Sequence, residues 1–186
     1  MAEEKIFDEL LVIRSQGGDR EALSLLIKRW NRKMMSKAYI LTNDYDACGD
    51  IVQECWYAIV KSINKLQDPK LFGVWVYRIV QGKSVDWIRD RQKQRRTVET
   101  EKADNHFSGI TPPLTSIDKS DQEEAISNLR IALKKLPADQ QFILSLHYLE
   151  NHPVVEIGKI LKIPTGTVKS RLFNARKNLL KTFKKL

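Results

Sequence analysis

The sequence predicts an all-α protein of two small helical domains joined by a flexible linker, with a helix-turn-helix in the C-terminal domain. Three observations predict this fold. Apolar residues recur at spacings of three and four along most of the chain and almost nowhere alternate, which is the pattern of amphipathic helices. The pattern stops for about two dozen residues near the middle and then resumes. The chain has 186 residues, which fits one domain or two small ones.

Four helices are expected in the first domain, residues 1–96. They cover about residues 6–15, 20–41, 45–66 and 72–95. The first ends at Gly17 and Gly18, and Asp19 suits the N-cap of the second. The third ends before Pro69, because proline cannot continue the helical hydrogen-bond ladder.

Residues 97–119 lack an apolar period and contain two adjacent prolines, so they are expected to form the linker. The second domain then covers residues 120–186. It opens on the capping-box pattern Ser120-Asp121-Gln122-Glu123, which restarts a helix that runs to Leu136. Three further helices are expected over about residues 138–149, 153–161 and 167–186.

The last two of these helices are separated by a tight turn and have helix-turn-helix spacing. The final helix carries one apolar stripe, formed by Val168, Leu172, Ala175, Leu179 and Phe183. Polar and basic side chains outside the stripe suit the major groove of DNA, because arginine can bind guanine edges while hydroxyls and helix N-terminal amides bind phosphate. The candidate DNA-binding residues are Thr165, Thr167, Lys169, Ser170, Arg171, Asn174 and Arg176.

The charge distribution favours the same interpretation. The net charge is +9, and nine of the 32 Lys and Arg residues follow Glu156, the last acidic residue. Such a concentration of positive charge suits a polyphosphate partner. A solvated basic tail, or a helical bundle whose charged face only confers solubility, is the alternative. The absence of acids from the final helix favours DNA, because a merely solvated helix usually mixes both signs.

The fourth helix combines basic residues with Trp75, Tyr77 and Trp87. Aromatic rings beside cations can stack on and hold unpaired bases, which suggests single-stranded DNA. The alternative is that Tyr77, Val80 and Trp87 share one face and belong to the core, whereas Trp75 points elsewhere. The basic end of the helix, from Arg89 onward, is the stronger nucleic-acid candidate.

The third helix presents an acidic face that would repel DNA. Its members within one quadrant are Asp46, Asp50, Gln53, Glu54 and Tyr57. Either this face is ordinary solvated surface or it docks on a basic protein partner, and the residues alone leave both open. The two cysteines, Cys48 and Cys55, are too far apart in a helix to form a disulfide and are expected in the core.

Three stretches in this order carry a family resemblance. They are Asp-Ile-Val-Gln-Glu at 50–54, Phe-Gly-Val-Trp-Val-Tyr-Arg-Ile at 72–79 with Val-Asp-Trp-Ile-Arg-Asp-Arg at 85–91, and Leu-Pro-Ala-Asp-Gln-Gln at 136–141 with Glu-Ile-Gly-Lys-Ile-Leu-Lys-Ile-Pro-Thr-Gly-Thr-Val-Lys-Ser-Arg at 156–171. The chain resembles the sigma factors of bacterial RNA polymerase. Within them it resembles the extracytoplasmic-function class, which keeps only the promoter-melting and the minus-35-binding domains.

The resemblance implies an alternative sigma factor. Residues 1–96 would be region 2, residues 120–186 region 4, and the linker 97–119 would thread toward the active-site cleft and the RNA exit path. The residues implied in docking on core polymerase are Asp46, Asp50, Gln53 and Glu54. Those implied in holding the melted minus-10 element are Lys70, Leu71, Phe72, Trp75, Arg78, Lys83, Arg89 and Arg91. Region 4 would bind the minus-35 duplex.

The expected partners are therefore core RNA polymerase, promoter DNA and an anti-sigma factor, with no small-molecule substrate. Neither a signal peptide nor a bilayer-spanning run is expected from the sequence, so the chain is expected in the cytoplasm, where an anti-sigma factor can hold it at the membrane. Two positions depart from the family pattern. Gly49 stands where a glutamate is common, and Gly82 stands where an asparagine is frequent.

Two other classes of function are considered. A stand-alone repressor or response-regulator output domain would bind its duplex tightly without polymerase, whereas a sigma factor binds promoters well only in the holoenzyme. An enzyme has little support, because the three histidines lack metal-ligand spacing and no phosphate-binding glycine loop is present. No catalytic residue, metal site or cofactor is therefore expected.

Overall fold

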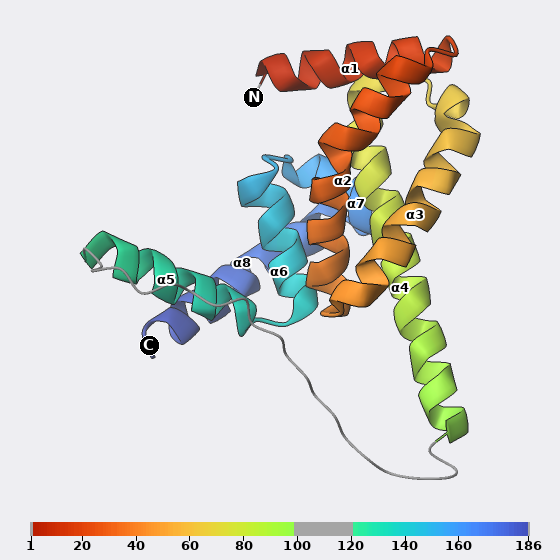
Figure 1. Cartoon of the computed structure of the whole chain (residues 1–186). Coiled ribbons are helices and arrows are strands. Elements are labelled where there is room, and N and C mark those ends of the chain that lie inside the picture. Colours follow the sequence, from red (N-terminus) through yellow and green to blue (C-terminus); the bar gives the residue numbers. More distant parts are fainter. Residues whose placement is uncertain (1, 99–120, 186) are drawn as a thin grey trace.

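The computed structural model describes residues 2–98 and 121–185, and within these ranges every regular element is helical (Figure 1). The elements in chain order are α1 (Ala2–Gln16), α2 (Arg20–Thr42), α3 (Tyr45–Ser62), the 3₁₀ turns η1 (Ile63–Lys65) and η2 (Pro69–Leu71), α4 (Phe72–Val98), α5 (Asp121–Lys134), α6 (Ala138–Leu144), the π-helical turn η3 (Ser145–Leu149), α7 (Val154–Leu161) and α8 (Thr165–Phe183). The all-α prediction is confirmed. Across the described helices, none is long and apolar enough to cross a membrane.

The helix termini follow the local sequence closely. Asp19 caps α2 as predicted, because its carboxylate accepts hydrogen bonds from two backbone N–H groups of the first turn, at 2.9 and 3.0 Å. Helix α3 ends at Ser62, earlier than predicted, and the 3₁₀ turn η1 follows it. Helix α4 reaches Val98, so it extends slightly into the predicted linker. The rest of that linker, and Ser120 of the predicted capping box, lie outside the described residues.

The N-terminal core forms where α2, α3 and α4 meet. Its centre is Trp30, whose ring lies edge-on to Phe72 at a centroid distance of 5.2 Å and also lies 5.5 Å from the ring of Tyr77. Helix α1 crosses one end of these helices (Figure 1). It is held there by Asp8, which accepts hydrogen bonds from Arg29 Nε at 2.7 Å and from Trp30 Nε1 at 3.1 Å.

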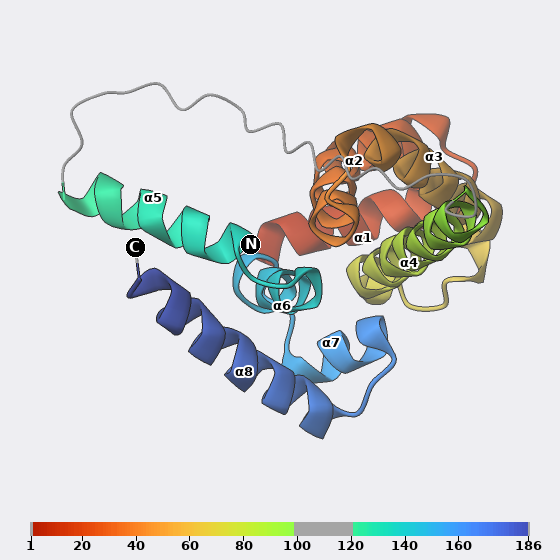
Figure 2. The same cartoon turned by 90° about the horizontal axis from the view of Figure 1, so that it is seen from below.

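The C-terminal domain contains the predicted helix-turn-helix, formed by α7 and α8 (Figure 2). Helix α7 ends at Leu161, and its C-cap Lys162 adopts a left-handed conformation with φ 55°. Helix α8 begins at Thr165, two residues earlier than predicted, so the turn is shorter and Thr165 belongs to the first helical turn. The predicted apolar stripe of α8 is confirmed. Its N-terminal members are buried and its last two, Leu179 and Phe183, are half-buried.

The two domains pack against each other. Helix α4 contacts α7, and helix α2 contacts α6. Figure 2 shows α7 below α4 in the view, and in Figure 1 α7 lies behind the N-terminal helices. The buried apolar residues of both domains form one continuous cluster. The sequence predicts the two domains, but it does not predict this contact between them.

The turn of the helix-turn-helix leaves no space beside Gly158. A Cβ atom at this position would lie 3.0 Å from the backbone carbonyl oxygen of Ile163. We therefore expect Gly158→Ala to lower the free energy of unfolding by about 1–3 kcal/mol, because the turn must shift to relieve the contact. The free energy is measured by urea denaturation.

Gly166→Ala is the matched control, since no atom lies within 4 Å of its Cβ position and alanine favours the helix. It should leave the stability unchanged or raise it by up to about 1 kcal/mol. Equal losses of stability in both variants would contradict the steric explanation.

Candidate nucleic-acid and protein interfaces

The first turns of α8 present a positively charged surface. Lys169, Ser170 and Arg171 are exposed, and the Ser170 hydroxyl donates a hydrogen bond to the backbone carbonyl of Thr167 at 3.0 Å. In the part of the chain that the structure describes, neither Lys169 nor Arg171 forms an ion pair with an acid. These charges are available to an external anion, and the amino-terminal end of the helix adds its own partial positive charge.

The other predicted minus-35 residues differ in their surroundings. Thr165 and Asn174 are exposed, whereas Thr167 is half-buried. The guanidinium of Arg176 donates to the backbone carbonyl of Leu172 at 3.3 Å and to the Tyr148 hydroxyl at 3.5 Å. Arg176 is nevertheless exposed, as are Thr165, Lys169, Ser170, Arg171 and Asn174 among the predicted minus-35 residues.

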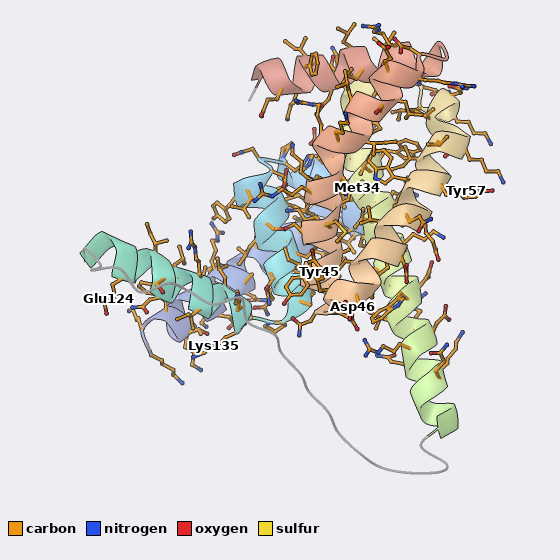
Figure 3. The ribbon with its side chains drawn as sticks, viewed as in Figure 1. Met34, Tyr45, Asp46, Tyr57, Glu124 and Lys135 are labelled. Atoms are coloured by element: carbon orange, nitrogen blue, oxygen red, sulfur yellow. The ribbon has the colours of Figure 1, made fainter. Side chains whose placement is uncertain are left out.

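The acidic face of α3 is exposed, as the sequence predicts. Asp46, Asp50, Gln53 and Glu54 all point to solvent. Figure 3 labels Asp46 near the start of α3 and Tyr57 near its end, so the face extends along most of the helix. A shallow hollow of about 610 Å³ is lined by Asp50, Gln53, Glu54 and Tyr57. This surface offers negative charge beside an exposed aromatic ring, which suits a basic protein partner.

One ion pair joins the two predicted sites of the N-terminal domain. Lys83 Nζ lies 2.8 Å from Glu54 Oε2, so a predicted minus-10 residue on α4 holds a predicted polymerase-docking residue on α3. The hydrogen bond to Glu54 raises the pKa of Lys83. Lys83 thus neutralises part of the acidic face, and it is less available to DNA than the sequence suggests.

Phe72 is not positioned to contact DNA, which corrects the prediction for this residue. Its side chain is only 1% exposed, and its ring packs between Trp30 and Trp75. The reason is that a large apolar ring at the first turn of α4 fills the space against α2. The neighbouring Lys70 is exposed and Leu71 is half-buried. These two residues therefore remain minus-10 candidates at this end of α4, and Phe72 does not.

The aromatic residues of α4 divide between core and surface. Tyr77 and Val80 are fully buried, which confirms their interpretation as core residues. Trp87 is half-buried, and the guanidinium of Arg91 lies 4.8 Å from the centroid of its ring. Trp75 is half-buried as well, so part of this residue remains accessible.

The basic end of α4 is partly committed to contacts within the protein. Arg91 forms an ion pair with Asp44, the N-cap of α3, and so ties the middle of α4 to the start of α3. The hydrogen bond from the Ala47 N–H and the charge of Arg91 lower the pKa of Asp44 despite its partial burial. Arg78 and Arg89 are exposed, and Arg89 lies 3.8 Å from Asp86 in a surface pair.

Sequence reasoning missed a polar cluster between the domains. Lys37 lies on the apolar stripe of α2, and its Nζ forms an ion pair with Glu150 at 2.9 Å. His152 Nδ1 donates a hydrogen bond to Glu156 Oε2 at 2.6 Å, and the His152 ring meets that of Tyr77 edge-on at 5.5 Å. A lysine among the buried positions of an amphipathic helix is the one sequence signal that pointed to this cluster.

Family models agree with this architecture. The sigma-70 region 2 model matches residues 26–94, and the sigma-70 region 4 model matches residues 127–179. The chain belongs to the sigma-70 family of RNA polymerase sigma factors, within its extracytoplasmic-function class. Helix α1 precedes the part of the chain that the region 2 model matches.

Among similar proteins is the ECF RNA polymerase sigma-E factor of Haemophilus influenzae, which is 31% identical over 181 residues that cover 93% of each chain. The protein of the same name from Escherichia coli K12 is 29% identical over 182 residues, covering 93% of this chain and 92% of that protein. The match therefore extends over both domains.

Two solved structures share the fold. CnrH in complex with the cytosolic domain of CnrY has a TM-score of 0.64 and 17% identity, and the match covers 96% of this chain and 97% of CnrH. The sigma factor RpoE of Bartonella quintana, solved with the anti-sigma factor NepR, has a TM-score of 0.67 and 19% identity, with 87% and 96% of the two chains covered.

The ion pair of Asp44 yields a pH-dependent prediction. A carboxylate whose pKa is lowered on folding stabilises the fold above its unfolded pKa, near 3.8, and this contribution is lost as the pH falls through the lower folded value. We expect Asp44→Asn to cost about 0.5–1 kcal/mol of stability at pH 7. The difference from the wild type should shrink as the pH falls below 3.8.

Urea denaturation of both chains between pH 3 and 7 measures this difference, with Asp90→Asn on the exposed surface of α4 as the control. If the difference in free energy of unfolding between the wild type and Asp44→Asn stays constant across this range, the charge of Asp44 does not contribute to stability.

Proposed function

We propose that this chain is an alternative sigma factor that binds core RNA polymerase through α3 and grips a promoter at two places. Helix α8 reads the minus-35 duplex, and the start and exposed flank of α4 hold the melted minus-10 strand. The main support for assigning polymerase binding to α3 and minus-35 binding to α8 is the separation of charge between them. The α3 face is acidic and exposed, whereas the first turns of α8 are basic and contain no acid. One surface suits a basic protein and the other suits DNA.

The minus-10 surface proposed here differs from the one that the sequence suggests. It consists of the exposed Lys70, Arg78 and Arg89, together with the half-buried Trp75 and Leu71. Cations surrounding an aromatic edge can hold unpaired bases by stacking and by phosphate contacts. Lys83 and Arg91 contribute mainly by fixing α4 to α3, since each pairs with an acid of that helix.

The chain acts as a transcription-initiation factor, and we propose that it works in the cytoplasm. Two structures with the same fold were solved as complexes, CnrH with the cytosolic domain of CnrY and RpoE with the anti-sigma factor NepR. We propose that an anti-sigma factor likewise binds this chain and blocks its access to polymerase.

The docking surface on α3 is tested with two opposite changes. Asp50→Ala removes an exposed acid and should weaken the affinity for core polymerase, by about 0.5–2 kcal/mol if the charge contacts a basic partner. Gly49→Glu adds an acid to the same face, where nothing lies within 4 Å of the Cβ position. This variant should bind core polymerase more tightly than the wild type. The affinity is measured by fluorescence titration of core polymerase.

Glu124→Ala serves as the control, because Glu124 is exposed on α5, away from α3. Circular dichroism should show an unchanged helical content for all three variants. If neither Asp50→Ala nor Gly49→Glu shifts the affinity relative to Glu124→Ala, the α3 face is not the docking site.

The recognition helix is tested at Arg171, which is exposed in the second turn of α8. We expect Arg171→Ala to cost about 1–3 kcal/mol at a preferred minus-35 sequence and to relax the preference among sequences, because bidentate contacts to guanine carry specificity. The holoenzyme's affinity for a panel of promoter duplexes measures both effects.

Lys181→Ala provides the comparison, since Lys181 is exposed near the end of the same helix. It should weaken binding slightly and uniformly across the panel, as loss of a distant positive charge would. A uniform loss for Arg171→Ala as well would assign Arg171 to a phosphate contact.

A further inference from the structure

A side chain at the end of α1 holds the segment that leads into α4. The amide nitrogen of Gln16, Nε2, donates hydrogen bonds to the backbone carbonyl oxygens of Ile63 and Leu66, both at 2.8 Å. These partners lie 47 and 50 residues away in the sequence. A side-chain amide carries two N–H groups, so one is available for each carbonyl. Gln16 therefore joins α1 to both ends of the 3₁₀ turn η1.

The Gln16 side chain is not needed to end its own helix. The backbone N–H groups of Gly17, Gly18 and Asp19 donate to carbonyls near the end of α1, at 3.1, 3.1 and 3.0 Å. Gly18 has φ 88°, a left-handed conformation that commonly ends a helix. Because the backbone closes α1 by itself, the two hydrogen bonds of Gln16 serve the segment around η1 and not α1.

The segment after η1 is short and carries two minus-10 candidates. Between Leu66 and Phe72, the turn η2 presents the exposed Lys70 and the half-buried Leu71. The far end of this segment is fixed, because the Phe72 ring packs on Trp30 in the core. Five residues, 67–71, separate the two fixed ends. Anchors so close together determine where the residues between them lie.

The segment also has hydrogen bonds of its own. The Leu66 N–H donates to the Ile63 carbonyl at 3.1 Å. Asp68 caps η2, because its carboxylate accepts from the Lys70 N–H at 3.0 Å and its carbonyl accepts from the Leu71 N–H at 3.0 Å. These local bonds shape each turn internally, whereas the bonds from α1 place the turns relative to the rest of the domain.

Helix α1 can serve as a fixed support because it is tied to the core. The Asp8 carboxylate accepts a hydrogen bond from Trp30 Nε1 at 3.1 Å, and Gln16 lies about 12 Å further along the same helix. Helix α1 also contacts both η1 and η2. Recognition of a base requires side chains held within about 0.5 Å of their productive positions. A helix anchored at Trp30 and bonded to η1 can supply that order.

We propose that Gln16 is a positioning residue for minus-10 recognition, which fixes η1 and η2 so that Lys70 and Leu71 meet the melted strand in one geometry. This inference rests on the proposed sigma-factor function. Gln16 acts through the two carbonyls that it binds and not through contact with DNA. Its loss should therefore affect the reading of minus-10 bases more than the binding of polymerase or of the minus-35 duplex.

The test replaces Gln16 with methionine, which has a similar length and helix propensity but no N–H donor. Ser15→Ala is the matched control, because the Ser15 hydroxyl donates to the Leu11 carbonyl within α1 at 2.7 Å, and both changes leave the charge unaltered. The DNA comes from a promoter that the wild-type holoenzyme transcribes. Holoenzymes are titrated with fork-junction DNA whose minus-10 strand is unpaired, with versions carrying single-base changes in that strand, and with the minus-35 duplex.

Gln16→Met should weaken binding to the fork-junction DNA about 3- to 10-fold, because the segment no longer meets the strand in a preset geometry. It should also reduce the discrimination against single-base changes in the minus-10 strand. Affinities for core polymerase and for the minus-35 duplex should match those of the wild type. Ser15→Ala should match the wild type in every measurement.

Amide hydrogen exchange in the free chain tests the anchor without polymerase or DNA. Gln16→Met should speed exchange at the Leu66, Lys70 and Leu71 amides, whose hydrogen bonds belong to the two turns. Exchange at Cys55, in the buried middle of α3, should stay at the wild-type rate.

Three results would overturn the proposal. Gln16→Met could distinguish minus-10 bases as well as Ser15→Ala does, it could weaken all three ligands equally, or it could leave the exchange of the two turns unchanged. Failure of the sigma-factor function is a separate result, in which the wild-type holoenzyme shows no preference among promoter sequences. The positioning role would then fall with that function, while amide exchange would still show whether Gln16 orders the segment.

Discussion

The contact of Trp30 with the aromatic rings of α4 is the interaction on which the rest of the structure depends. Phe72 and Tyr77 pack on its ring and thereby fix α4 against α2. Its indole N–H donates to Asp8, which holds α1 across the same helices. The indole of Trp30 on α2 thus contacts side chains of both α1 and α4, and so links three helices through one buried residue.

Charge is divided among surfaces that this core orients in different directions. The acidic face of α3 and the basic face of α8 belong to different domains, and each is exposed. Where opposite charges do meet, they connect elements of the fold. Lys83 joins α4 to α3, Arg91 joins α4 to the N-cap of α3, and Lys37 joins the two domains. The position of a charge in the fold therefore decides whether it serves an external partner.

The contact between the domains contains charged side chains from both sides. Glu150 pairs with Lys37 on α2, and the ring of His152 lies 3.7 Å from the position of a Cβ atom at Gly73, in the first turn of α4. A polar bridge at such a contact suits a reversible interaction, since it specifies the docked arrangement more than it stabilises it.

The sequence by itself determined the helices, their caps and the faces that carry charge. Asp19, the apolar stripe of α8 and the acidic face of α3 are readable because helical periodicity and capping depend on neighbours within one or two turns. It also carried enough family pattern, at 50–54 and at 156–171, to indicate a sigma factor. Only the tertiary structure decided that Phe72 is core, that Lys83 and Arg91 are paired, and that Lys37 meets Glu150. These outcomes depend on contacts between residues far apart in the chain, and helical periodicity holds no information about which distant side chain fills a given space.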